Sequence, residues 1–137
     1  MSSYAIPQSV YTDLEGFRKG HSDFAQGKLD ALTFKTIRVP FGIYEQREPD
    51  TYMLRLKSAA CSISPKQLRG LAKLAGEYAN PLLHITTRGG VQLHYAKYDD
   101  LVALTEKIMA LGLSGRGSGG NTVRNIVADP LAGIAPD

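Results

Sequence analysis

The feature that most constrains this chain is a hydrophobic period that changes repeatedly along its length. In TYMLRLKS, Tyr52, Leu54 and Leu56 alternate with their neighbours, which predicts a strand with one buried face. The next segment, SPKQLRGLAKLAGEYA, begins with Ser64 as a helix N-cap, and Gln67 completes a capping box. The apolar stripe of this helix comprises Leu68, Leu71, Ala72, Ala75, Tyr78 and Ala79.

The same change of period occurs again after Asn80-Pro81, where the first helix is expected to end. Segments 82–87 and 91–96 have strand patterns on either side of Arg88-Gly89-Gly90, which predicts a hairpin. A second helix is expected to begin after Asp99 or Asp100. Its apolar stripe comprises Leu101, Leu104, Ile108 and Leu111. With an extended piece at 123–127, this order predicts an α+β fold of the ferredoxin-like split βαβ type, with two helices on one face of an antiparallel sheet.

Residues 1–50 lack such a period and contain frequent glycine and proline. We expect an irregular N-terminal arm, with a short helix near Thr12–Arg18 and a short strand near Phe34–Val39. The expected division is therefore an arm at 1–50 and a folded domain at 51–137.

Composition narrows the class of protein. The 137 residues are 43% hydrophobic and 21% charged, which is typical of one globular domain. The net charge of +3 does not by itself imply nucleic acid. The first residues lack the pattern of a signal peptide, and no segment approaches the roughly 18 apolar residues of a membrane span. We therefore expect a cytoplasmic protein with no membrane partner.

Alternation along the predicted strands places hydrogen-bond donors on one face of the sheet. If the apolar residues face the helices, Val91, Leu93 and Tyr95 lie on the covered face. The opposite face then presents Arg55, Lys57, His84, Thr86, Arg88, Gln92 and His94. Such a face can bind a polyanion, because arginine donates two parallel hydrogen bonds to a carboxylate. An ordinary solvated sheet face has the same composition, and this alternative stays open.

Other residues have structural as well as functional interpretations. His84 and His94 favour hydrogen-bonded sheet positions over metal ligation, because no carboxylate or cysteine accompanies them at ligand spacing. Cys61, the single cysteine, favours a packed thiol over a nucleophile and cannot hold a zinc or iron–sulfur site alone. The glycines at 115–120 are compatible with a linker or with backbone that approaches a ligand closely.

Three motifs together resemble one known family. YMLRLK, TTRGGVQLH and GSGGNTVRNIVADPLAGI are similar, in this order, to the N-terminal half of the sirohaem-dependent nitrite and sulfite reductases. The resemblance covers about Phe34 to Ile134. It implies a ferredoxin-like half-domain that packs against a C-terminal half carrying sirohaem and a [4Fe–4S] cluster. It further implies a six-electron reduction of sulfite to sulfide or of nitrite to ammonia.

The resemblance also implies roles for individual residues. Arg55 and Arg124 match the pair that binds the anionic substrate, which makes them the candidate catalytic residues. The candidate cofactor-binding residues are Thr86, Thr87, Arg88, Gln92, His94, Asn121 and Asn125. No metal ligand is expected in this chain.

The sequence departs from the family pattern at three places. Gly89 follows Arg88 where the family commonly has glutamine, and Ser-Ala-Ala-Cys stands where it often has a Pro-Gly-Gly turn. The cysteine pairs that bind the cluster lie further C-terminal in the family, whereas this chain has one cysteine. We therefore expect part of a longer enzyme, with no reductase activity of its own.

Partners follow from the same resemblance. They are the C-terminal half, sulfite or nitrite, and an electron donor such as ferredoxin or a flavoprotein. A homodimer through the donor face is compatible with the sequence. The alternative is a stand-alone ferredoxin-like module that senses or carries a small anion. Single-stranded RNA binding is disfavoured, because the expected aromatic motif is absent and Tyr95 alternates with the apolar set.

Overall fold

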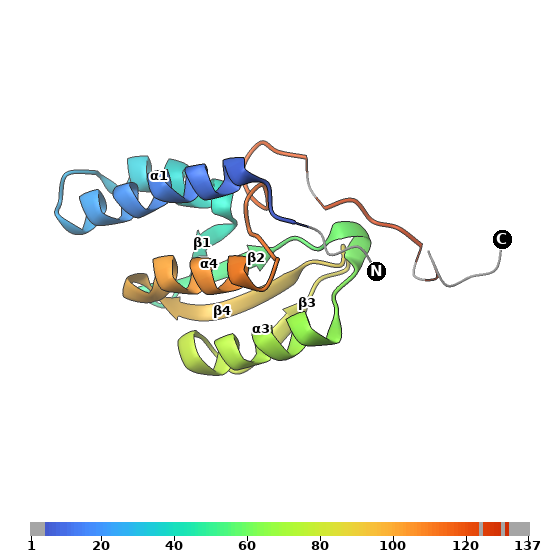
Figure 1. Ribbon diagram of the computed structural model, residues 1–137. Helices are drawn as coiled ribbons and strands as arrows, with labels where there is room; N and C mark the ends of the chain where they lie inside the picture. The colour runs from blue at the N-terminus through green and yellow to red at the C-terminus, as the bar shows by residue number, and fades with distance from the viewer. Residues whose placement is uncertain (1–4, 124, 130, 132–137) are drawn as a thin grey trace.

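The computed structural model describes residues 5–123, 125–129 and 131. Figure 1 shows a small antiparallel sheet with helices packed against it. The helices are α1 (Gln8–Ala25), α2 (Ala31–Arg38), α3 (Pro65–Tyr78) and α4 (Leu101–Ala110). The strands are β1 (Ile43–Glu45), β2 (Thr51–Leu56), β3 (Leu83–Ile85) and β4 (Val91–Lys97).

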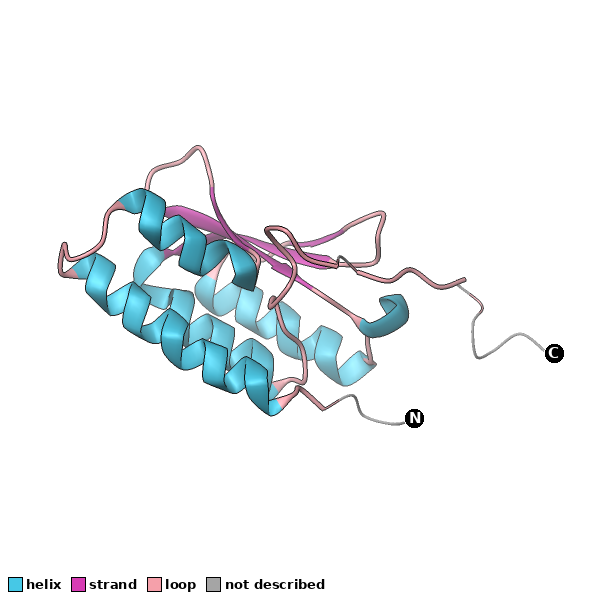
Figure 2. Cartoon of the chain, turned by 90° about the horizontal axis from the view of Figure 1, so that it is seen from above, coloured by secondary structure: helices cyan, strands magenta, loops and turns pink. Residues whose placement is uncertain are grey.

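The sheet has the order β1-β2-β4-β3, and each neighbouring pair is antiparallel. Figure 2 shows the helices gathered on one side of the sheet. Leu54, Leu56, Val91 and Leu93 face that side and are at most 3% exposed. The predicted α+β class, with helices on one face of an antiparallel sheet, is confirmed.

The first predicted helix and the hairpin are both present in the structure. Ser64 accepts a hydrogen bond from the Gln67 backbone N–H, and the Gln67 side chain accepts one from the Ser64 N–H. This capping box satisfies two backbone donors at the start of α3. The buried stripe of α3 differs from the expected one, because Leu74 is buried whereas Leu68 is 45% exposed. Hairpin strands β3 and β4 pair from Leu83↔Leu93 to Ile85↔Val91.

The prediction of an irregular arm at 1–50 is wrong in its secondary structure. The short helix expected near Thr12–Arg18 is present as part of the longer α1, whereas the segment expected as a strand near Phe34–Val39 lies mainly in α2. Asp30 caps α2 by accepting from the Thr33 backbone N–H at 2.7 Å. Phe17 and Phe34, each 1% exposed, belong to the same core as the sheet. The proposed domain boundary at residue 50 stays a prediction.

The strand that completes the sheet differs from the one expected at 123–127. It is β1, which pairs with β2 through Ile43↔Leu54. Residues 123 and 125–127 belong to no strand, so the expected extended piece does not join the sheet there. Among the described residues, no helix is both long enough and apolar enough to cross a membrane.

Candidate anion-binding site

Three segments far apart in the sequence meet at one end of the sheet. They are the end of β2, the turn between β3 and β4, and the chain that follows α4; Figure 1 shows them together near the η2 turn, Ala59–Cys61. Between them lies an open hollow of about 180 Å³. It is lined by Arg55, Leu56, Lys57, Thr86, Thr87, Arg88, Gly90, Ser118 and Asn125.

Glycines hold the chain after α4 against the sheet. Lys57 N–H donates to the Ser114 carbonyl at 2.9 Å, so this chain continues the edge of β2. At Gly115 and Gly119 a side chain would collide with the backbone carbonyls of Phe41 and Val39. These two glycines therefore let the segment after α4 pack closely against residues 39–41. This contact sets residues 117–118 beside Lys57.

The β3–β4 turn is closed by its own threonine. Thr86 N–H donates to the Gly90 carbonyl at 2.8 Å, and Gly90 N–H donates to Thr86 Oγ1 at 3.0 Å. The Thr86 side chain is thus used to shape the turn. Thr87 and Arg88 stand exposed at its tip, where they line the hollow.

The turn is tied to both neighbouring segments through backbone carbonyls. Asn125 Nδ2 donates to the Arg88 carbonyl at 2.9 Å, and Ser58 Oγ donates to the Gly89 carbonyl at 2.8 Å. Cys61 Sγ lies 3.6 Å from the Arg88 carbonyl. Side-chain donors from two distant segments therefore fix the backbone that carries Arg88.

Arg55 is positioned by its cross-strand neighbours. Gln92 pairs with Arg55 on one side and with His84 on the other. With its amide oriented to satisfy both, the Gln92 oxygen accepts from Arg55 Nε at 3.0 Å and Nη2 at 3.2 Å, and its nitrogen donates to His84 Nδ1 at 3.2 Å. The Arg55 guanidinium also lies 5.3 Å from the centre of the Tyr44 ring.

Among the described residues, the hollow gathers positive charge without a carboxylate. Some arginines elsewhere pair with carboxylates, such as Arg38 with Glu45 at 3.0 Å and Arg116 with Asp13 at 2.7 Å. Within the described ranges, neither Arg55 nor Arg88 forms an ion pair with a carboxylate. Their positive charge therefore remains uncompensated there and favours an anion.

A second hollow, of about 420 Å³, lies beside β3 and contains the two sheet histidines. It is lined by Asn80, Leu82, Leu83, His84, Ile85, His94 and Tyr95. The His84 and His94 rings stack with their centres 5.8 Å apart. Burial lowers the pKa of His94, and the neighbouring His84 lowers it further. In the part of the chain that the structure describes, no three potential metal ligands cluster.

A bulge changes the face on which Tyr95 lies. Tyr52 pairs with Ala96 but Leu54 pairs with Leu93, so two residues of β4 oppose Met53. Tyr95 adopts a left-handed φ of 65°, and its N–H donates to Gln46 Oε1 at 2.7 Å. Consequently Ala96 is buried and Tyr95 is 44% exposed, the reverse of the predicted alternation. The position of Tyr95 therefore no longer argues against an RNA-binding face.

The structure brings together five of the predicted site residues. Arg55, Thr86, Thr87, Arg88 and Asn125 line the first hollow. Gln92 is 7% exposed and contacts Arg55 from the neighbouring strand. His94 belongs to the second hollow, and Asn121 is exposed and lines neither hollow. Arg124 falls outside the described residues. The hollow also contains two polar side chains that the candidate site lacked, those of Lys57 and Ser118. Lys57 had a signal in its strand alternation, whereas Ser118 stood within the third motif but had no role of its own in the prediction.

The family model of the nitrite/sulfite reductase ferredoxin-like half domain matches residues 44–111 of the chain. The chain belongs to this family. The chain is 33% identical over 105 residues to the assimilatory ferredoxin-dependent nitrite reductase of Haloferax mediterranei, in an alignment that covers 68% of the chain and 18% of that protein. The chain is 28% identical over 134 residues to sulfite reductase (ferredoxin) 1 of Mycolicibacterium paratuberculosis, over 83% of the chain and 24% of that protein.

A solved structure confirms the predicted ferredoxin-like fold. The chain matches the structure of the Mycobacterium tuberculosis NirA protein with a TM-score of 0.76, over 88% of this chain and 26% of that chain. The sequence identity is 20%, so this likeness concerns the fold alone. The chain spans less than a quarter of the length of both curated relatives, at 18% and 24%.

Proposed function

We propose that this chain is the sirohaem- and anion-binding N-terminal part of a nitrite or sulfite reductase. The observation that carries the proposal is the hollow in which Arg55 and Arg88 have no carboxylate partner among the described residues. Fixed donors aimed at one space bind an anion without having to reorganise. The family supplies the identity of the anions, because its named relatives include nitrite and sulfite reductases.

The donor chemistry of the hollow fits the carboxylates of sirohaem. Arg88 and Thr87, exposed at the tip of the turn, would hydrogen-bond these carboxylates. Arg55, held in place by Gln92, would hold the substrate oxyanion. Arg124 would be the second substrate arginine, as the family resemblance implies. When bound, sirohaem would supply the redox chemistry of the six-electron reduction, while this chain binds and orients.

The residues do not fit the [4Fe–4S] cluster. Such a cluster needs four thiolates or equivalent ligands, and Cys61 is the only cysteine of the chain. In our proposal a C-terminal half supplies the cluster, and ferredoxin or a flavoprotein supplies electrons. This chain alone is then inactive as a reductase. A cytoplasmic location, as expected from the sequence, is part of the proposal.

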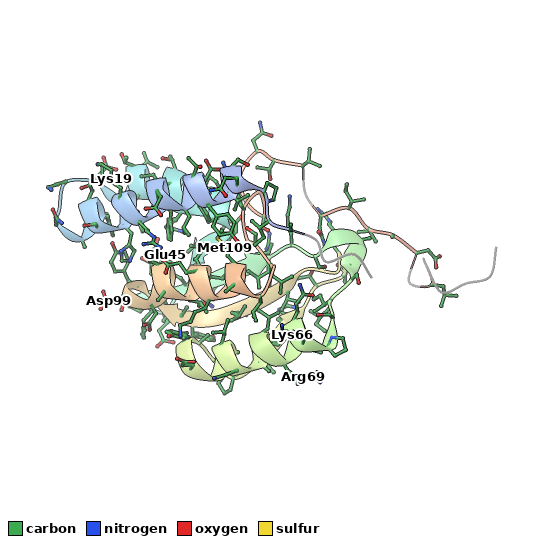
Figure 3. All side chains as sticks on the ribbon, in the orientation of Figure 1. Lys19, Glu45, Lys66, Arg69, Asp99 and Met109 are labelled. Atoms are coloured by element: carbon green, nitrogen blue, oxygen red, sulfur yellow. The ribbon has the colours of Figure 1, made fainter. Side chains whose placement is uncertain are left out.

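Titration with free sirohaem tests this function. The 137-residue chain is expected to bind sirohaem, followed by visible absorption, and Arg88→Ala is expected to weaken that binding. Arg69→Ala is the matched control, because Arg69 is an exposed arginine on α3, on the helical side of the sheet (Figure 3). Equal loss in both variants would indicate a general charge effect. Absence of binding to the wild-type chain would contradict a sirohaem-binding role.

A further inference from the structure

One buried polar group in the wall of the hollow has no partner in the described part of the chain. The Ser118 side chain is 2% exposed, and its Oγ forms no hydrogen bond with any residue that the structure describes. Among the described residues, no other buried side-chain nitrogen or oxygen atom lacks a hydrogen-bond partner. Burying a hydroxyl without a partner destabilises a fold, so an orphan of this kind needs an explanation.

Ser118 is held in place by the backbone around it. Its N–H donates to the Gly115 carbonyl at 2.9 Å. A Cβ atom on Gly42 would lie 2.9 Å from Ser118 Cβ, so glycine at 42 leaves the room that the serine fills. Gly42 also has a left-handed φ of 74°, which favours glycine independently. The serine hydroxyl is thus part of a fixed wall.

The surroundings of Ser118 are cationic. It lines the same hollow as Arg55, Lys57 and Arg88. Lys57 Nζ donates to the Val123 carbonyl at 2.8 Å, which holds this ammonium beside the loop that carries Ser118. The hollow of about 180 Å³ has room for several water molecules or a small oxyanion, given roughly 30 Å³ per water.

We propose that Ser118 Oγ donates a hydrogen bond to an anionic oxygen of the ligand in this hollow, and so is a further binding residue of the site. The inference rests on the proposed function and extends it by one named donor. A serine hydroxyl suits this role because it adds a donor without adding charge. The anionic oxygen belongs either to a carboxylate of sirohaem or to an inorganic oxyanion such as sulfite or nitrite.

The test compares the wild-type chain with Ser118→Ala, using sirohaem, sulfite and nitrite as separate probes. Loss of a hydrogen bond to a charged group is expected to weaken binding about 10- to 100-fold. Weaker binding of sirohaem alone would identify a carboxylate as the acceptor. Weaker binding of sulfite or nitrite alone would identify the inorganic oxyanion. The control is Ser9→Ala, at an exposed position on α1, and its affinity is expected to equal that of the wild type.

Unfolding of the ligand-free variants separates binding from packing. Ser118→Ala removes a buried hydroxyl without a partner, so its thermal midpoint is expected to equal or exceed that of the wild type. Ser118→Cys keeps the shape of the side chain with a slightly larger atom and a weaker donor, and is expected to bind weakly as well. Unchanged affinity in Ser118→Ala would overturn the inference, whatever the thermal midpoint of the variant. If Arg88→Ala still weakened binding, the proposed function would survive that failure. A wild-type chain that bound none of the probes would contradict both.

Discussion

The Cys61 side chain occupies the space that a Cβ atom on Gly89 would need. Gly89 has a left-handed φ of 67° in the β3–β4 turn, and Cys61 Sγ lies 3.6 Å from the neighbouring Arg88 carbonyl. These are two of the positions at which the sequence departs from the pattern of its family. The structure shows that the two departures touch each other, so the Cys61 side chain fits against the turn only because residue 89 is glycine.

Gly89→Ala is expected to destabilise the fold by more than about 1 kcal/mol, because the new Cβ meets both a left-handed φ and Cys61. The measurement is the free energy of unfolding from urea titration. Gly76→Ala is the matched control: Gly76 lies in α3 with nothing within 4 Å of its would-be Cβ. That variant is expected to gain up to about 1 kcal/mol, because alanine favours a helix.

A double-mutant cycle tests the contact itself. Cys61→Gly removes the side chain that blocks Gly89, and its φ of 62° suits glycine. Gly89→Ala is therefore expected to cost less in the Cys61→Gly background than in the wild type. Additive effects of the two substitutions would show that the destabilisation comes from backbone strain alone.

Residues 8–38 are expected to contribute strongly to stability, although their sequence looks irregular. Phe17 in α1 is 1% exposed, and its ring stacks on Phe41 with the centres 5.1 Å apart. Phe17→Ala should cost about 3–5 kcal/mol in the free energy of unfolding. Tyr11→Ala, on the same helix but 40% exposed, should cost far less. Similar small losses in both would mean that α1 is not an integral part of the core.

Elements with a clear period were predictable from the sequence, and the N-terminal helices were not. The capping box at Ser64 and Gln67 is a local signal, and the structure preserves it. In α1, by contrast, Gly16 faces open space, whereas a Cβ on Gly20 would lie 2.7 Å from Ile37 Cδ1. A glycine that breaks a helix and a glycine that lets a second helix approach look the same in a sequence. Only the packing of α2 distinguishes them.

The candidate site shows the same limit. Arg55 was placed correctly because strand alternation is local. The exposed side of Tyr95 was not predicted, because it depends on a bulge that appears only when β4 pairs with β2. Ser118 was missed for a related reason, since its burial depends on Gly42, which is distant in sequence.

His94 is expected to make stability depend on pH. Burial first, and then the His84 charge, lower the pKa of His94 below its usual 6.5 in the folded state. As the pH falls below about 6.5, the unfolded chain therefore binds a proton more readily than the folded one, and stability declines until the folded pKa is passed. The contribution is complete above that range.

Urea midpoints near pH 7.5 and near pH 5 measure this effect, and the difference should be smaller in His94→Gln than in the wild type. His21→Gln serves as a comparison, because His21 lies in α1 against Tyr98 and away from the other histidines. If the difference between the two urea midpoints were larger in His94→Gln than in the wild type, folding would raise the pKa of His94 instead of lowering it, which would contradict the assignment.

Gln92 is expected to act on anion binding through Arg55. Gln92→Leu removes the oxygen that accepts from Arg55 Nε and Nη2, so Arg55 loses its fixed direction. Sulfite binding to the 137-residue chain is expected to weaken about tenfold. Gln92→Glu keeps the size but places a carboxylate beside Arg55, which should preserve stability while it weakens sulfite binding further. Gln8→Leu, at an exposed position in α1, is the control. If affinity followed the unfolding free energy in every variant, Gln92 would have only a structural role.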